Sequence, residues 1–348
     1  MMLFGYRRRT ARLHAMRLFT EKRVRERHFG KTSDGWNIAL HRLPQRRVKS
    51  GQPPILLCHG LGANRFNLDA PGDSSLAQWL WNQGHECWVV ELRGAGESSR
   101  PRRDNDLSWD WTFDDYVTKD IPTALDVIER VTGHEQVHWV GHSMGGMIGY
   151  AYLLSQTPER VRSLSTIGSP SFSRLGNRYL DRIIGLKTLV KQIKRLPYEG
   201  TGAAVIPAMP LFRETFGRLV TNPRNISNRD LMKMIYLIPS DLPTSLIIQL
   251  ADWYSEGGFS DTTGQVRYCD ELERIKTPTL VIAGAKDYLT PEKEITHVYE
   301  NLGAEEKKLL VLSRANGCRH DYGHIDPVFG RWASSEVWPA IRDWIASH

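Results

Sequence analysis

The segment Gln136–Gly145, which reads Gln-Val-His-Trp-Val-Gly-His-Ser-Met-Gly, decides the fold class. Its first five residues, Gln136–Val140, form a short apolar run that predicts a buried β-strand. The next five place Ser143 between two glycines, Gly141 and Gly145. A serine in this pattern stands on a tight turn from a strand into a helix, and its hydroxyl is exposed at the carboxyl edge of a sheet. The pattern therefore predicts that Ser143 is a nucleophile.

Short apolar strands alternate with helices on both sides of this segment. Unbroken apolar strands separated by helices are typical of a mostly parallel sheet that helices cover on both faces. We therefore predict an α/β protein. The expected strands are Arg27–Gly30 and Trp36–Leu43 (a hairpin), Pro53–Cys58, Glu86–Leu92, Gln136–Val140, Val161–Ile167, Thr279–Ala283 and Lys308–Leu312, and the expected helices of this core are Ser74–Gln83, Trp111–Val131, Gly146–Ser155 and Ser335–Ala346.

The pattern changes between about residues 171 and 270. Apolar residues recur there at steps of three or four, and prolines divide the region into helices, with no alternation typical of strands. We interpret residues 171–270 as a helical cap inserted after the sixth core strand. The remaining parts are a basic arm, 1–27, and an α/β core made of 28–170 and 271–348. The four expected cap helices lie within 175–193, Leu211–Val220, Leu231–Ile238 and Leu246–Trp253.

A serine hydroxyl needs a base before it can act as a nucleophile. Of the twelve histidines, His324 is the best candidate, because it lies in a loop between the last strand and the last helix. His320 is the rival, and we interpret it as an exposed loop residue. His142 is interpreted as a packed residue that supports the site, and His138, inside a strand, as structural.

The base in turn needs a carboxylate that holds its tautomer. In this arrangement the acid lies between the serine and the histidine along the chain. Asp287 follows the strand Thr279–Ala283 and is therefore expected at the same edge of the sheet as Ser143. Asp321 and Asp326 are so close to His324 in sequence that we interpret them as loop caps or supports.

Attack on a carbonyl carbon also requires donors for the developing oxyanion. The backbone N–H of Met144, directly after the nucleophile, is one predicted donor. The second is expected in the loop after Pro53–Cys58, which reads His-Gly-Leu-Gly over residues 59–62. We assign it to the backbone N–H of Leu61.

Composition excludes several other classes of protein. The net charge of +7 lies wholly in residues 1–27, which hold nine basic and two acidic residues, so the rest of the chain is formally neutral. The sequence contains no run of 18 apolar residues, so it predicts no membrane-spanning helix. The four cysteines form no CxxC pair, and Cys58 and Cys87 are expected to be buried thiols. A cytoplasmic location is the expectation, with possible peripheral membrane contact through the basic arm.

Cofactor, metal and nucleic-acid sites are not expected. Gly94-Ala95-Gly96 has Ser99 where a dinucleotide-binding motif requires its third glycine. His320 and His324 are four residues apart, but no HExxH motif or third ligand accompanies them. The aromatic residues of the arm are not part of a nucleic-acid-binding motif.

The chain resembles the α/β-hydrolase superfamily over roughly residues 50–170 and 275–348. Thr112–Gly149, with its Gly-His-Ser-Met-Gly turn, is similar to lipases of the acid-lipase type, whose His-Leu-Asp motif matches His324-Ile325-Asp326. The same segment and Gly323–Ile345 are similar to polyhydroxyalkanoate synthases. Those acyltransferases use a cysteine at the position of Ser143.

This resemblance implies an α/β-hydrolase fold and a serine hydrolase with the triad Ser143, Asp287 and His324. We expect a carboxylic ester hydrolase that acts through an acyl-enzyme on a small-molecule or lipid ester, with an apolar acyl pocket under the cap. Two alternatives stay open. One is an acyltransferase that uses a thioester or polyester donor, and the other is a non-catalytic, ligand-binding protein of the same fold.

Overall fold

The computed structural model of the 348-residue chain describes residues 25–45, 51–172, 193–199, 216–256 and 258–348. Most of the basic arm and the first expected cap helix therefore lie outside the described residues. Half of Leu211–Val220 also lies outside them, and its described half is the short helix α10 (Phe216–Val220). The basic arm and the boundaries of the cap therefore stay predictions.

Eight strands form one mixed sheet in the order β1-β2-β4-β3-β5-β6-β9-β10. β1 and β2 form the expected antiparallel hairpin, β2 pairs antiparallel with β4, and all other pairs are parallel. The prediction of an α/β protein with a mostly parallel sheet is confirmed. The strands are β1 (Glu26–Lys31), β2 (Asn37–Leu43), β3 (Ile55–Cys58), β4 (Cys87–Glu91), β5 (Val137–His142), β6 (Val161–Ile167), β9 (Thr279–Gly284) and β10 (Lys307–Leu312).

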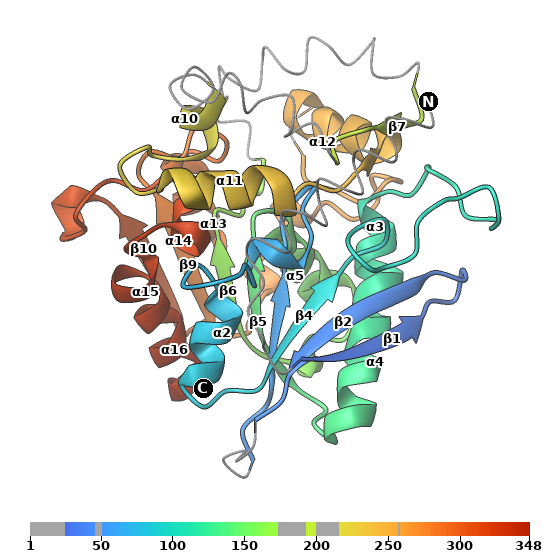
Figure 1. The fold of residues 1–348 in the computed structure, drawn as a ribbon, viewed down its shortest axis with the longest axis horizontal. Helices are drawn as coiled ribbons and strands as arrows, with labels where there is room; N and C mark the ends of the chain where they lie inside the picture. The colour runs from blue at the N-terminus through green and yellow to red at the C-terminus, as the bar shows by residue number, and fades with distance from the viewer. Residues whose placement is uncertain (1–24, 46–50, 173–192, 200–215, 257) are drawn as a thin grey trace.

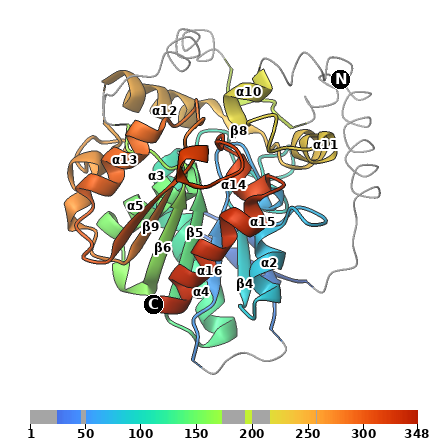
Figure 2. The same ribbon diagram turned by 90° about the vertical axis from the view of Figure 1, so that its left-hand side faces the viewer.

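Helices cover both faces of this sheet. Successive side chains of its central strands point to opposite faces, so each of these strands contributes to two cores. In β3, Leu56 faces a core that also contains α4 (Ile121–Thr132), α5 (Met144–Ser155) and α13 (Glu292–Asn301). Its neighbour Leu57 faces a second core with α2 (Leu76–Asn82), α14 (Asp326–Phe329), α15 (Ala333–Glu336) and α16 (Trp338–Ser347). Figures 1 and 2 show α4 and α16 on opposite sides of the sheet.

Two predicted helices differ in the structure, and one helix was not predicted. The expected helix Trp111–Val131 consists of α3 (Phe113–Asp115), a π-helical turn (Tyr116–Asp120) and α4. The π-helical turn ends at the buried Asp120, which accepts hydrogen bonds from Arg93. The expected last helix is split at Val337 into α15 and α16. Helix α13 was not predicted, since only a few of its side chains, such as Ile295 and Val298, enter the core.

The region between β6 and β9 contains α10, α11 (Asn228–Leu237) and α12 (Thr244–Glu256). These helices lie above the carboxyl edge of the sheet (Figure 1). Sequence reasoning expected no strand in this region, yet β7 (Arg195–Leu196) and β8 (Leu242–Pro243) pair antiparallel. Each is only two residues long, too short for an alternating pattern to be visible. Within the described ranges, none of the helices is long and apolar enough to cross a membrane.

Candidate active site

Ser143 stands on a strained turn between β5 and α5. Its backbone has φ 53° and ψ −120°, a conformation that non-glycine residues rarely adopt. A Cβ atom on Gly141 would lie 2.5 Å from the Gly145 backbone, and one on Gly145 would overlap the Cys58 carbonyl. The two glycines are therefore required by close packing of the turn against its own helix and against β3.

His324 and Asp287 are in direct contact and buried. Nδ1 of His324 lies 2.6 Å from Oδ2 of Asp287. A carboxylate can only accept, so Nδ1 donates and Nε2 is left as the basic nitrogen. Oδ1 of Asp287 accepts from the N–H groups of Leu289 and Thr290, and Oδ2 accepts from Oγ1 of Thr290 at 2.6 Å. The carboxylate is thus fixed in one orientation by its own loop.

Ser143 and His324 line one cavity of about 280 Å³ at the carboxyl edge of the sheet. The two side chains come from elements separated by 181 positions, and Asp287 lies behind His324. The structure therefore brings the three predicted triad residues to one place. Leu61 also lines this cavity and is 37% exposed. Most of the other lining is apolar: Ala63, Phe172, Val220, Met234, Ile235, Ile238, Pro239, Leu289 and Ile325.

His59 orients the peptide bond that carries the predicted oxyanion donor. Its Nε2 accepts from the N–H of Leu92 at 3.2 Å, so the proton is on Nδ1, which donates to the Gly60 carbonyl at 2.9 Å. Burial lowers the pKa of His59 and keeps the ring neutral. Because the peptide bond is trans, the N–H of Leu61 points away from the carbonyl that His59 holds.

Asn67 and His142 connect this loop to the base. Oδ1 of Asn67 accepts from the Gly60 N–H at 3.1 Å and lies 2.9 Å from Nδ1 of His142. Nε2 of His142 lies 3.1 Å from the carbonyl oxygen of His324. Burial, and then the nearby His324, lower the pKa of His142 to about 3. A ring this weakly basic is unsuited to act as a general base at neutral pH, in agreement with its interpretation as a support.

The comparisons with known proteins agree with this architecture. Residues 53–199 match the family model described as alpha/beta hydrolase fold. An esterase from Exiguobacterium antarcticum superimposes with a TM-score of 0.60 at 19% identity, covering 91% of this chain and 98% of the esterase. The protein has the α/β-hydrolase fold. The resemblance of the sequence to this superfamily is confirmed.

Two curated relatives are distant homologues of this chain. The poly(3-hydroxyalkanoate) polymerase subunit PhaC of Haloferax mediterranei is 25% identical over 84% of this chain and 58% of its own length. The human lysosomal acid lipase/cholesteryl ester hydrolase is 29% identical over 51% of this chain and 49% of its own length. The matched segments thus span about half the length of these relatives.

The rival residues have other roles in the structure. Oδ2 of Asp326 accepts from the N–H groups of Gly323 and Asn222 and from Nδ2 of Asn225. Burial raises the pKa of this carboxyl to about 7. Asp326 therefore supports the loop that carries His324. Oδ1 of Asp321 accepts from the Arg314 N–H at the surface.

Two other histidines that the sequence analysis weighed also have different surroundings. Nδ1 of His138 lies 2.8 Å from Oγ of Ser163 on the neighbouring strand, as expected of a structural residue. His320 is partly exposed and does not line the cavity that contains Ser143. Among the described residues, no group of three or more His, Cys, Asp or Glu side chains could hold a metal ion.

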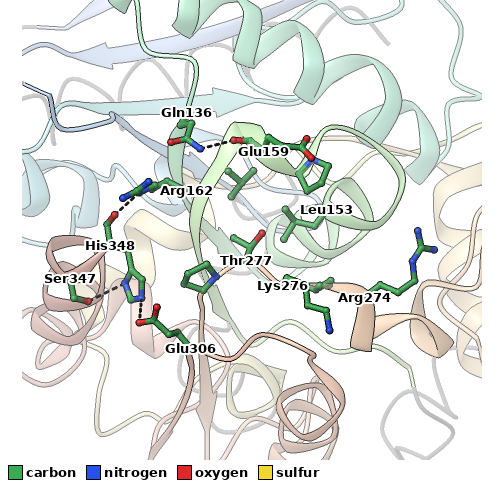
Figure 3. A pocket seen from close by; sticks show the side chains of 14 residues that line it. Gln136, Leu153, Glu159, Arg162, Arg274, Lys276, Thr277, Glu306, Ser347 and His348 are labelled. Carbon is green, nitrogen blue, oxygen red and sulfur yellow. Dashed lines mark hydrogen bonds and ion pairs between the residues drawn. The ribbon is translucent and has the colours of Figure 1, made fainter.

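A larger cavity of about 620 Å³ lies at the opposite, amino end of the strands. Several of its polar side chains form hydrogen bonds or ion pairs within the lining, as Figure 3 shows. Nε of Arg162 donates to the His348 carbonyl, Nε2 of His348 lies 3.1 Å from Glu306, and Gln136 donates to the carbonyl of Glu159. The chemistry of an α/β-hydrolase is expected at the carboxyl edge, so this cavity is not the candidate site.

Three contributors to the site were not identified from the sequence: Asn67, Thr290 and the side chain of His59. Asn67 is 75 positions from His142, and no motif connects them. Thr290 lies three residues after Asp287, where a hydroxyl that accompanies the acid could have been considered. His59 begins the predicted glycine loop, but its role depends on Leu92, which directly follows β4.

Proposed function

We propose that the protein is a serine carboxylic ester hydrolase of the esterase or lipase type, with Ser143, Asp287 and His324 as its triad. The observation that carries the proposal is the buried 2.6 Å contact between His324 and Asp287 beside the cavity that Ser143 lines. A histidine held by a carboxylate next to a serine on a strained turn is the arrangement that activates a hydroxyl for attack on a carbonyl.

In the proposed mechanism, Nε2 of His324 takes the proton of the Ser143 hydroxyl as its oxygen bonds to the carbonyl carbon. The N–H groups of Leu61 and Met144 donate to the resulting oxyanion. The C–O bond to the alcohol then breaks, and His324 returns the proton to the leaving oxygen. Water, deprotonated by His324, attacks the acyl-enzyme in the same way and releases the acid and Ser143.

The apolar lining of the cavity supports an ester with an apolar acyl part. Side chains from the cap region, among them Met234, Ile235 and Ile238, form one of its walls. Burial of a methylene group against such a wall contributes about 0.8 kcal/mol. We therefore propose a lipid-like or other apolar acyl ester as the substrate.

The decisive experiment uses nitrophenyl esters of increasing acyl length with the wild type and Ser143→Ala. We expect hydrolysis that rises from the acetate to longer chains in the wild type and is lost in the variant. Labelling by a fluorophosphonate probe should follow the same pattern. A wild-type protein that neither hydrolyses these esters nor reacts with the probe would support a non-catalytic, ligand-binding role instead.

Acyl transfer is a second candidate, favoured by the match to the PhaC subunit across 84% of this chain. The nucleophile argues against polymerisation, since Ser143 stands where the resembling synthases use a cysteine. A thioester donor separates the two functions. Free acid as the product supports the hydrolase, whereas acyl transfer to an added hydroxy acid would support the transferase.

A further inference from the structure

A third cavity, of about 360 Å³, lies beside the one that Ser143 lines. Two short segments form much of it. One follows α10 and leads to α11, and the other is the loop that carries Asp287. Among the residues that the structure describes, its lining contains three cationic side chains and no acidic one: Arg218, Thr221, Asn222, Pro223, Arg224, Lys286 and Tyr288.

The charge of this cavity is only partly neutralised by its surroundings. Nζ of Lys286 lies 3.5 Å from Oδ2 of Asp321, and both side chains are substantially exposed. Across the described residues, no carboxylate pairs with the guanidinium of Arg224. The Arg224 backbone N–H instead donates to Oδ1 of Asn222, which fixes the turn that presents the side chain. The cavity therefore offers charged donors to an anion from solution.

The contrast with the larger cavity of Figure 3 is informative. There, the two arginines have partners within the protein, since Arg162 donates to the His348 carbonyl and Arg274 forms an ion pair with Glu271. Beside the candidate active site, Arg224 has none of this kind. An arginine is especially suited to carboxylate and phosphate because its planar guanidinium can donate two parallel hydrogen bonds.

The position of the cavity connects it to the catalytic one. Val220 lines the cavity of Ser143, and the next residue, Thr221, lines the basic cavity. In the acid loop, Tyr288 lines the basic cavity, and Leu289 lines the catalytic one. Both cavities thus share the same two walls, so a ligand that enters one lies close to the other.

We propose that the basic cavity is a subsite for an anionic group, a carboxylate or phosphate, carried by the ester substrate. This inference rests on the proposed function and narrows it, because the substrate would combine an apolar acyl part with a negative charge. Arg224 and Lys286 are the specificity-determining residues. An uncharged ester of the same size makes no use of them.

The test compares two soluble nitrophenyl esters, a butyrate and the monoester of glutaric acid, which differ by a terminal carboxylate. In Arg224→Gln/Lys286→Gln, we expect kcat/KM for the glutarate ester to fall roughly tenfold, a typical size for losing charged hydrogen bonds near a surface. The butyrate should change less than twofold. The control variant Arg130→Gln/Lys308→Gln makes the same charge change on exposed residues of α4 and β10. Its kcat/KM for each ester should equal that of the wild type.

A binding measurement separates failure of this subsite from failure of the proposed function. Inorganic phosphate, titrated by calorimetry into Ser143→Ala, should bind, and binding should be lost when the two charge substitutions are added. This readout does not require turnover. The proposal would be overturned if the double variant and the wild type had the same kcat/KM for each of the two esters.

Vesicles test the other source of a phosphate group, a lipid headgroup. Sedimentation with anionic and neutral vesicles is measured for the wild type and the double variant. If the double variant loses binding to anionic vesicles and still treats both soluble esters as the wild type does, the cavity contacts a membrane surface and the substrate subsite is refuted. Unchanged vesicle binding together with selective loss on the glutarate ester supports the subsite.

Discussion

At the scale of single residues, the acceptor-only chemistry of Asp287 controls the tautomer of His324. Asp287→Asn replaces one acceptor oxygen with a donor group, which favours the tautomer with the proton on Nε2. We expect kcat for a nitrophenyl ester to fall by on the order of 10⁴ with little change in KM, as in other triads. Asp321→Asn is the matched control and should change kcat less than fivefold. A small effect at Asp287 together with a large one at Asp321 would reassign the acid.

Asn67 gives a second prediction at this scale. Asn67→Ala removes the acceptor of the Gly60 N–H and leaves the loop that carries Leu61 less restrained. Loss of one oxyanion donor costs about 10²–10³ in kcat, so a displaced donor should cost roughly tenfold to a hundredfold. The rate of fluorophosphonate labelling should fall in parallel, whereas Asn301→Ala, on an exposed end of α13, should leave both unchanged.

The residue scale also shows what sequence alone can predict. That Ser143, Asp287 and His324 lie together was predictable, because each follows a strand and strands that run in parallel end at one edge. Asn67 and Thr290 were not, because nothing in their local sequence shows the long-range contacts that give them a role. Their hydrogen bonds exist only once β3, β5 and the loop after β9 are packed together.

At the scale of elements, the turn between β5 and α5 depends on the absence of side chains. In Gly145→Ala, the added methyl group would overlap the carbonyl of Cys58 in β3. We expect a loss of more than about 2 kcal/mol in the free energy of unfolding and a loss of ester hydrolysis. Urea denaturation measures the first and a nitrophenyl ester the second. Gly149→Ala, one helical turn later, meets only the flexible tip of Leu164 at 3.0 Å and should be much milder.

Helices and strands were predicted well where the side chains of one face, or all side chains, are buried. All eight strands of the large sheet were anticipated, most of them because their apolar runs are dense. The mostly polar and exposed β1 was anticipated only as the partner of β2 in a hairpin. The helix α13 was missed, because few of its residues enter the core. The split of the last helix at Val337 depends on how α15 and α16 pack, which local sequence does not specify. The π-helical turn likewise reflects a tertiary contact, that of Asp120 with Arg93.

At the scale of the whole molecule, Asp326 joins the segment before α11 to the loop of His324. Its pKa is raised by burial from 3.8 to about 7, so the folded state binds its proton more tightly than the unfolded state does. On this account, the group lowers the free energy of unfolding as pH rises between about 4 and 7, by up to a few kcal/mol. Asp326→Asn should flatten this part of the pH profile, as followed by urea denaturation at each pH. A profile that stays as steep would contradict the assignment.

The long separation between Ser143 and His324 has a consequence for the chain as the ribosome makes it. The serine turn can form once β3, β5 and β6 have emerged, but the imidazole of His324 leaves the exit tunnel only 181 residues after Ser143. A newly made chain with an exposed hydroxyl on its strained turn therefore has no base to activate it. In the proposed mechanism, reactivity begins only when the last third of the polypeptide has emerged and docked, and a partly synthesised protein is expected to be chemically silent toward the esters around it.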